Sequence, residues 1–289
     1  MILSTLDKSR KGGAYEQIPS LVLGQRWTPQ LNSRNMMKVV LCVWIEPYIE
    51  NDLSFCVWPV HTPTTSKEVL TLSASTSPLP YTGNKSCIVN TILSVMPKHT
   101  VYIDPCMGSA EVFFRKPRAE KEILNDYNGD LVNLFRVIQN NEKLAYLLGR
   151  LYLSINGELA FKQNKDRLKG VPNILDDVIE TSQIFYDASW EDIQNAAAFL
   201  ENQVYSFSST GQTFGIARRD MSQRLPRLMS AYNRIRDAII LHRDYKDVIT
   251  YAACPGSFIL LDPPYKGTED MYSKANFDIE QHDILFSFM

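Results

Sequence analysis

The sequence lacks the features that mark membrane and secreted proteins. Its longest apolar run near the N-terminus, Val39 to Ile45, is far too short to span a bilayer. No signal peptide is evident ahead of it. The five cysteines form no C-x-x-C pair and are odd in number, which indicates reduced, buried thiols rather than a disulfide framework. The sequence therefore predicts a soluble, cytoplasmic protein.

A strong net charge of either sign is also missing. Lysine and arginine number 30 and aspartate and glutamate 32, so the formal net charge is −2. This balance excludes a basic surface over the whole protein, and any contact with nucleic acid must use a local patch. Residues 218–243 contain such a patch, with seven arginines against two acids. It is either a solvated helix face or a phosphate-binding surface.

Residues 1–77 differ from the rest of the chain. Gly12-Gly13, scattered prolines and the Ser/Thr-rich stretch 62–77 break any long periodicity. The strand candidates there are Val39–Ile45 and Phe55–Val60. No motif lies in this region, so it is either a poorly ordered extension, a stretch that an upstream start site adds, or a domain of unknown role. We expect it to be dispensable, and one domain follows over residues 78–289.

From residue 78 onwards, short apolar segments alternate with amphipathic ones. The expected strands are 100–104, 121–125, 240–243 and 258–261. This alternation predicts an α/β protein with a mainly parallel sheet and helices on both faces. Asp104, Asp126 and Asp262 each lie at the end of a strand. Any one of them alone is explained as a helix cap, but the ends of parallel strands share one edge, where ligands bind.

The segment Asp262-Pro-Pro-Tyr265 carries the most specific signal in the sequence. Its two prolines fix the backbone and remove two donors, so the turn is stiff. The Asp262 carboxylate and the Pro263 carbonyl then offer two acceptors, as a planar exocyclic amine requires. Tyr265 supplies a face on which a base can stack. A proline-rich loop without chemistry is the less favoured alternative.

Two weaker motifs come earlier in the chain. The small residues between Asp104 and Ala110, Gly108 among them, let the backbone approach a ligand closely. This segment is not the G-x-G-x-x-G fingerprint of a dinucleotide site. Asp126 follows the second strand, where its two carboxylate oxygens are suited to a ribose diol.

Four segments in this order resemble the Dam-type DNA adenine-N6 methyltransferases, and among them the compact enzymes of phages and restriction systems. The similar segments are Pro80–Ser86, Asp104–Ala110, Asn125–Asn133 and Asp262–Tyr265. The resemblance runs from Leu79 to the end of the chain. It implies a Rossmann-like sheet that binds S-adenosylmethionine, with a helical and hairpin target-recognition insertion at about 141–236.

The resemblance and the arginine patch together assign roles to individual residues. The catalytic residues would be Asp262, Pro263 and Tyr265. The cofactor would contact Tyr81, Lys85, Asp104, Gly108, Asp126 and Asp262, with Lys85 pairing with its carboxylate. Double-stranded DNA would contact Ser206, Phe207, Ser208, Arg218, Arg219, Arg224 and Arg227. Methyl transfer would be direct, onto an adenine flipped out of the duplex, without a metal ion.

Alternative functions remain at this point. The catalytic motif would equally serve cytosine N4, adenine in RNA or a small amide, although the motif order and the hairpin 205–217 favour DNA adenine. The resembled family continues with further strands where this chain ends at Met289. The strand 258–261 is then expected at an exposed edge, which predicts self-association and weak catalysis. The corresponding alternative is an inactive remnant that binds DNA or cofactor.

Overall fold

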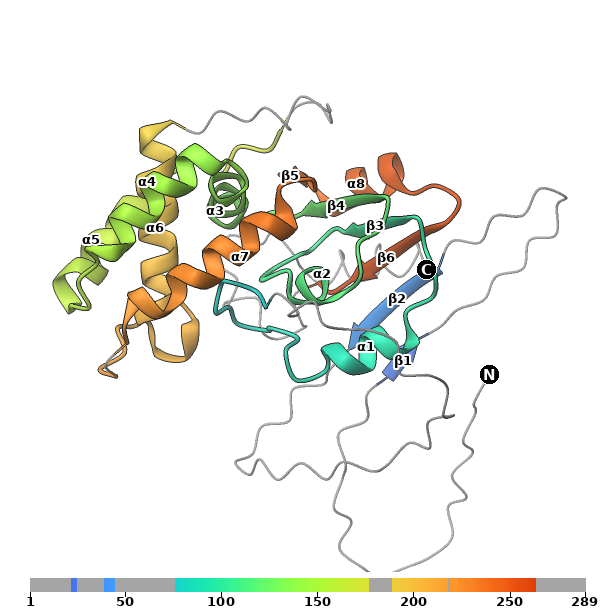
Figure 1. Ribbon diagram of the computed structural model, residues 1–289, viewed down its shortest axis with the longest axis horizontal. Coiled ribbons are helices and arrows are strands. Elements are labelled where there is room, and N and C mark those ends of the chain that lie inside the picture. Colours follow the sequence, from blue (N-terminus) through green and yellow to red (C-terminus); the bar gives the residue numbers. More distant parts are fainter. Residues whose placement is uncertain (1–21, 25–38, 45–75, 177–188, 218, 264–289) are drawn as a thin grey trace, which may run out of the picture.

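The computed structural model describes residues 22–24, 39–44, 76–176, 189–217 and 219–263. These residues form a six-stranded sheet in the order β1-β2-β6-β3-β4-β5 (Figure 1). The strands are β1 (Val22–Gly24), β2 (Val39–Trp44), β3 (Val101–Asp104), β4 (Lys121–Asn125), β5 (Ile239–Leu241) and β6 (Ser257–Leu261). Neighbouring strands are parallel except for the antiparallel pair β1–β2. The predicted α/β class is confirmed.

Helices cover both faces of this sheet because alternate strand residues point to opposite sides. Tyr102, Leu124 and Phe258 belong to the larger apolar core. That core also contains residues of α1 (Val89–Val95), α2 (Glu111–Arg115), α3 (Gly129–Gln139) and α7 (Leu225–Ile235). Ile103 and Ile259 pack on the other side against α8 (Tyr245–Ala252). All five residues of β6 are buried, as expected for a central parallel strand.

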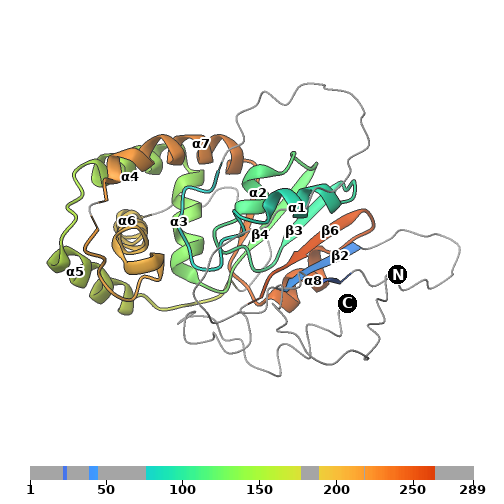
Figure 2. The same cartoon turned by 90° about the horizontal axis from the view of Figure 1, so that it is seen from below.

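A helical layer lies beyond α3, away from the sheet (Figure 2). It consists of α4 (Asn141–Tyr152), α5 (Glu158–Lys169) and α6 (Trp190–Tyr205). The side chain of Asn128 caps α3, and Ser189 forms a capping box with Asp192 at the start of α6. No helix in the described part of the chain is long and apolar enough to cross a membrane.

The strand β6 is not the edge of the sheet. Strand β2 runs parallel beside it, with Val39 opposite Phe258 and Cys42 opposite Leu261. The expectation that β6 exposes an unpaired edge is therefore wrong, and self-association through that edge loses its basis. Two segments from the first 77 residues instead contribute strands to the sheet. The second strand candidate there, Phe55–Val60, lies outside the described residues.

Candidate active site

The three predicted acids meet at the carboxyl edge of the sheet. Asp262, Asp104 and Asp126 end or directly follow the adjacent strands β6, β3 and β4. All three line one cavity of about 390 Å³, together with Tyr81 and Lys85. This volume lies in the range of small-molecule sites, roughly 300–1,000 Å³. The structure therefore brings together the residues expected to bind a cofactor.

The buried side chain of Asn125 holds the turns around this cavity in place. Its amide nitrogen donates to the carbonyls of Pro105 at 2.8 Å and Arg243 at 2.9 Å. Its amide oxygen accepts from the Arg243 N–H at 2.9 Å. One amide side chain thus ties the turn after β3 to the turn after β5. The sequence analysis did not single out this residue.

Asp126 is oriented by backbone donors. One carboxylate oxygen accepts from the Gly108 N–H and the other from the Asn128 N–H, both at 2.9 Å. Burial raises the pKa of this carboxyl to about 6, even though these hydrogen bonds favour the charged form. Gly108 has a φ of 48°, a conformation that suits glycine and turns its N–H toward Asp126.

Asp262 and Lys85 form an ion pair within the cavity. The Lys85 ammonium also donates to the carbonyl of Gly83 at 2.7 Å, and the residue is buried. Lys85 was expected to pair with the carboxylate of a cofactor, whereas in this structure its ammonium binds the carboxylate of Asp262. Pro263 is buried and lines the same cavity. Tyr265 lies outside the described residues.

Asp104 occupies the middle of the acidic group. The residue is 2% exposed. One carboxylate oxygen accepts from the Tyr102 hydroxyl at 3.0 Å, and the other has no hydrogen-bond partner among the described residues. Burial raises the pKa of Asp104 to about 8, with further contributions from the charges of Asp262 and Asp126.

The predicted hairpin is present as a tight loop at the end of α6. Ser206 and Phe214 form an antiparallel bridge, and the Phe207 N–H donates to the Thr213 carbonyl at 2.8 Å. Phe207 is 68% exposed, and its neighbour Ser208 is also exposed. Ser206 is fully buried and its hydroxyl accepts from the Gly211 N–H at 2.9 Å. In this structure the Ser206 side chain closes the loop and does not face solvent.

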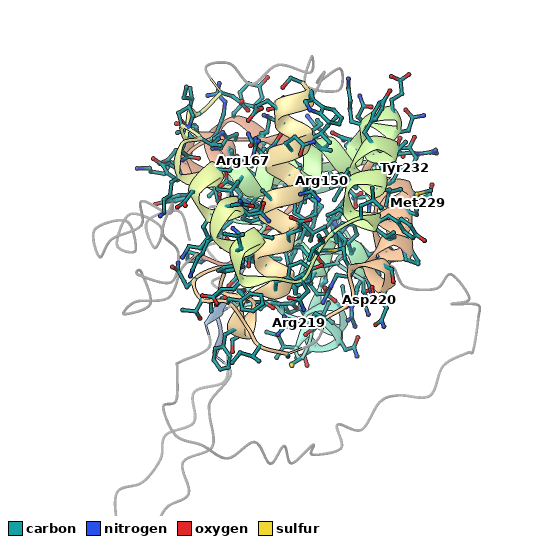
Figure 3. All side chains as sticks on the ribbon, turned by 90° about the vertical axis from the view of Figure 1, so that its left-hand side faces the viewer. Arg150, Arg167, Arg219, Asp220, Met229 and Tyr232 are labelled. Carbon is teal, nitrogen blue, oxygen red and sulfur yellow. The ribbon has the colours of Figure 1, made fainter. Side chains whose placement is uncertain are left out.

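The arginines of residues 218–243 do not form one surface. Arg219 donates to the Val204 carbonyl at 2.5 Å and so satisfies the end of α6 (Figure 3). Arg234 is buried against Glu122, at 2.5 Å. Arg227 is exposed and Arg224 half-buried. Arg218 lies outside the described residues. Of the three described arginines predicted to bind phosphates, Arg227 and Arg224 are more available than Arg219.

Several cavity-lining residues were missed from the sequence. Asp244 follows β5 and lines the cavity, so the rule that found three strand-end acids also covers this fourth one. Asn202 and Gln203 line it from the end of α6, and no local pattern marks them. Their helix is held by the buried Glu201, which accepts from Arg150 at 2.9 Å and from Asn164 at 2.6 Å (Figure 3).

Comparison with known proteins identifies relatives for most of the chain. The D12 class N6 adenine-specific DNA methyltransferase family matches residues 81–289. The chain is 23% identical over 192 residues to the Type II methyltransferase M1.LlaDCHI of Lactococcus lactis subsp. cremoris. That alignment covers 64% of this chain and 64% of the relative's length. The described residues hold no group of histidine, cysteine and acidic side chains suited to a metal ion.

Proposed function

Because the chain belongs to the D12 class N6 adenine-specific DNA methyltransferase family, we propose that it methylates the exocyclic amine of adenine in double-stranded DNA, with S-adenosylmethionine as the donor. The observation that carries this proposal is the meeting of Asp104, Asp126 and Asp262 in one cavity at the carboxyl edge of a Rossmann-like sheet. Each acid supports a different part of the chemistry.

The cavity fits a small cationic nucleoside. Its three strand-end carboxylates are opposed at this edge by the ammonium of Lys85, and Arg243 lines the β5 side. The buried, unpartnered oxygen of Asp104 calls for a donor or a positive charge. Asp126 is held with its carboxylate at the cavity wall, as the ribose hydroxyls require. When bound, the cofactor supplies an electrophilic methyl group.

Asp262 and Pro263 would act on the target amine. The adenine amine is a poor nucleophile because its lone pair is delocalised into the ring. Two acceptors on its hydrogens, the Asp262 carboxylate and the Pro263 carbonyl, favour a tetrahedral nitrogen and localise that lone pair. Asp262 is then placed to receive the proton that the amine loses. Lys85 fixes the orientation of the Asp262 carboxylate through its ion pair.

The hairpin at the end of α6 would contact DNA. Phe207 stands exposed at the surface and Ser208 beside it, which suits them to fill the gap left by an extruded base. Flipping a base costs a few kcal/mol, and such contacts offset part of it. Arg227 and Arg224 follow the hairpin and would contact phosphates.

Tritium transfer from labelled S-adenosylmethionine to duplex DNA tests the proposal. The wild-type chain should label duplex DNA in preference to RNA, and Asp262→Ala should abolish the labelling. Asp247→Asn, an exposed residue on α8, is the matched control and should leave it unchanged. Labelling of RNA alone, or labelling that survives in Asp262→Ala, would refute the proposal.

A further inference from the structure

Asp104 is surrounded by charged and titratable groups from every neighbouring element. Asp262 approaches from β6 and Asp126 from β4, and both disfavour a second negative charge. Tyr102 of the same strand donates its hydroxyl, and Lys85, from the segment before α1, supplies the opposing positive charge. Cys106 lies in the turn that follows, and burial raises the pKa of its thiol well above the usual value. Among these described groups, three carboxylates face the ammonium of Lys85.

Burial makes the ionised form of Asp104 unfavourable. The residue is 2% exposed, and one of its two oxygens has no partner among the described residues. A buried carboxylate in this setting favours the neutral acid. Burial accordingly raises the pKa of Asp104 to about 8, so most molecules carry the proton at pH 7 when the cavity holds no ligand.

We propose that Asp104 gives up this proton when a positively charged ligand binds, so that the site selects the sulfonium cofactor over its thioether product. This inference rests on the proposed function. S-adenosylmethionine carries a sulfonium, an ammonium and a carboxylate, a net charge of one positive unit. The product S-adenosylhomocysteine has lost the sulfonium charge. Only the former compensates an ionised Asp104.

The charge balance closes over one turnover. The sulfur–methyl bond breaks with its electron pair left on sulfur, a nitrogen–carbon bond forms, and the amine proton passes to Asp262, which returns it to solvent. The sulfur is then neutral, and Asp104 takes a proton back from solvent. Because only the cation stabilises the ionised Asp104, the site has a lower affinity for the product than for the next cofactor molecule.

The proposal sets a direction for pH dependence. Because cofactor binding requires ionised Asp104, its affinity should rise about tenfold per pH unit below pH 8 and level off above it. Affinity for S-adenosylhomocysteine should change much less. Asp104→Asn should make the pH dependence of affinity similar for the two ligands, since an amide cannot titrate.

Isothermal titration calorimetry measures the released proton directly. Each ligand is titrated into the full chain at pH 7 in two buffers of different ionisation enthalpy. The wild type should release about 0.9 proton with S-adenosylmethionine and far less with S-adenosylhomocysteine. Asp104→Asn should cut the difference to near zero and reduce the preference for the cofactor at least about fivefold. Any change in the protonation of the ligand's own amine is the same in the wild type and in Asp104→Asn, so it cancels when the two proteins are compared.

Tyr102→Phe is a second variant of almost unchanged shape. It removes the hydroxyl that stabilises the carboxylate, so the pH at which cofactor affinity levels off should move upward. Asp247→Asn changes an exposed residue of α8 that does not line the cavity, and should behave as the wild type. Failure of the wild type to bind either ligand would refute the proposed function. Binding of both with equal proton release, unmoved by Asp104→Asn or Tyr102→Phe, would overturn this inference alone.

Discussion

Lys85 and Asp262 form an ion pair that joins two distant parts of the chain, the segment before α1 and the turn after β6. The pair links the segment expected to bind the cofactor with the segment expected to carry out methyl transfer. Both side chains line the same cavity. The positive charge of Lys85 also acts on Asp104, whose pKa it lowers against the effect of burial. Lys85 therefore favours the ionised form of Asp104 and orients the carboxylate of Asp262.

Replacement of Lys85 by methionine should shift the pH–rate profile of methyl transfer to higher pH. Loss of the ammonium raises the pKa of Asp104, so its ionised form is reached later as the pH rises. We expect turnover at pH 7 to fall more than tenfold and to recover partly at pH 9. Lys162→Met, which breaks an exposed pair with Glu158 on α5, is the control and should not move the profile. An unmoved profile in Lys85→Met would contradict this role.

Asp262→Ala should abolish methyl transfer while cofactor binding persists at reduced affinity. The carboxylate is one of the two proposed acceptors for the target amine, and Asp126 and Asp104 remain to hold the cofactor. Turnover and calorimetric affinity are measured on the same preparation. Retention of more than about a tenth of the wild-type rate, about 1.4 kcal/mol in barrier, would remove Asp262 from the reaction.

Asn125→Ala should both destabilise the protein and weaken cofactor binding. Three backbone groups in the turns after β3 and β5 lose their partner, and buried groups left unpaired cost about 1–3 kcal/mol each. We expect a loss of about 3 kcal/mol in chemical denaturation. Asn140→Ala, which removes the cap of α4, should cost about 1 kcal/mol and spare cofactor affinity. Equal effects of the two changes would show that Asn125 does not shape the cavity.

The arginines of residues 218–243 should separate into two groups. Arg224→Ala with Arg227→Ala should weaken binding to all DNA sequences alike and lower the slope of log affinity against log salt by about 2. Arg234→Met should instead destabilise the fold by about 3–5 kcal/mol, because it leaves the buried Glu122 with one partner fewer. Nitrocellulose filter binding at several salt concentrations and chemical denaturation measure the two effects. An unchanged salt slope in the double variant would show that these arginines form a solvated face and do not contact phosphates.

Sequence reasoning located the fold class and the acidic edge because both depend on local patterns. Alternating apolar segments mark strands and helices, and an acid directly after a buried parallel strand must lie at the ligand edge. The burial of Arg234 and Ser206 was not predictable in this way. Arg234 meets Glu122 of β4 across the fold, and Ser206 closes a loop whose partner is Gly211. Such contacts are decided by tertiary packing.

The pairing of β2 with β6 was missed for the same reason. A short apolar run was recognised at residues 39–45, but nothing local indicates which strand it joins. Two strands from the first 77 residues belong to the sheet, so we now expect this region to contribute to stability. Deletion of residues 1–44 should remove the partner of β6 and expose an apolar edge. We expect a lower melting temperature and self-association in size-exclusion chromatography. A monomeric, equally stable deletion variant would show that β2 is not needed.

Mass spectrometry of nucleosides from methylated DNA tests the central claim most directly. The purified chain is incubated with S-adenosylmethionine and unmethylated duplex DNA, which is then digested to nucleosides. We expect N6-methyldeoxyadenosine in the wild-type reaction and none with Asp262→Ala. N4-methyldeoxycytidine in its place, or no methylated nucleoside from a chain that binds both cofactor and DNA, would contradict it.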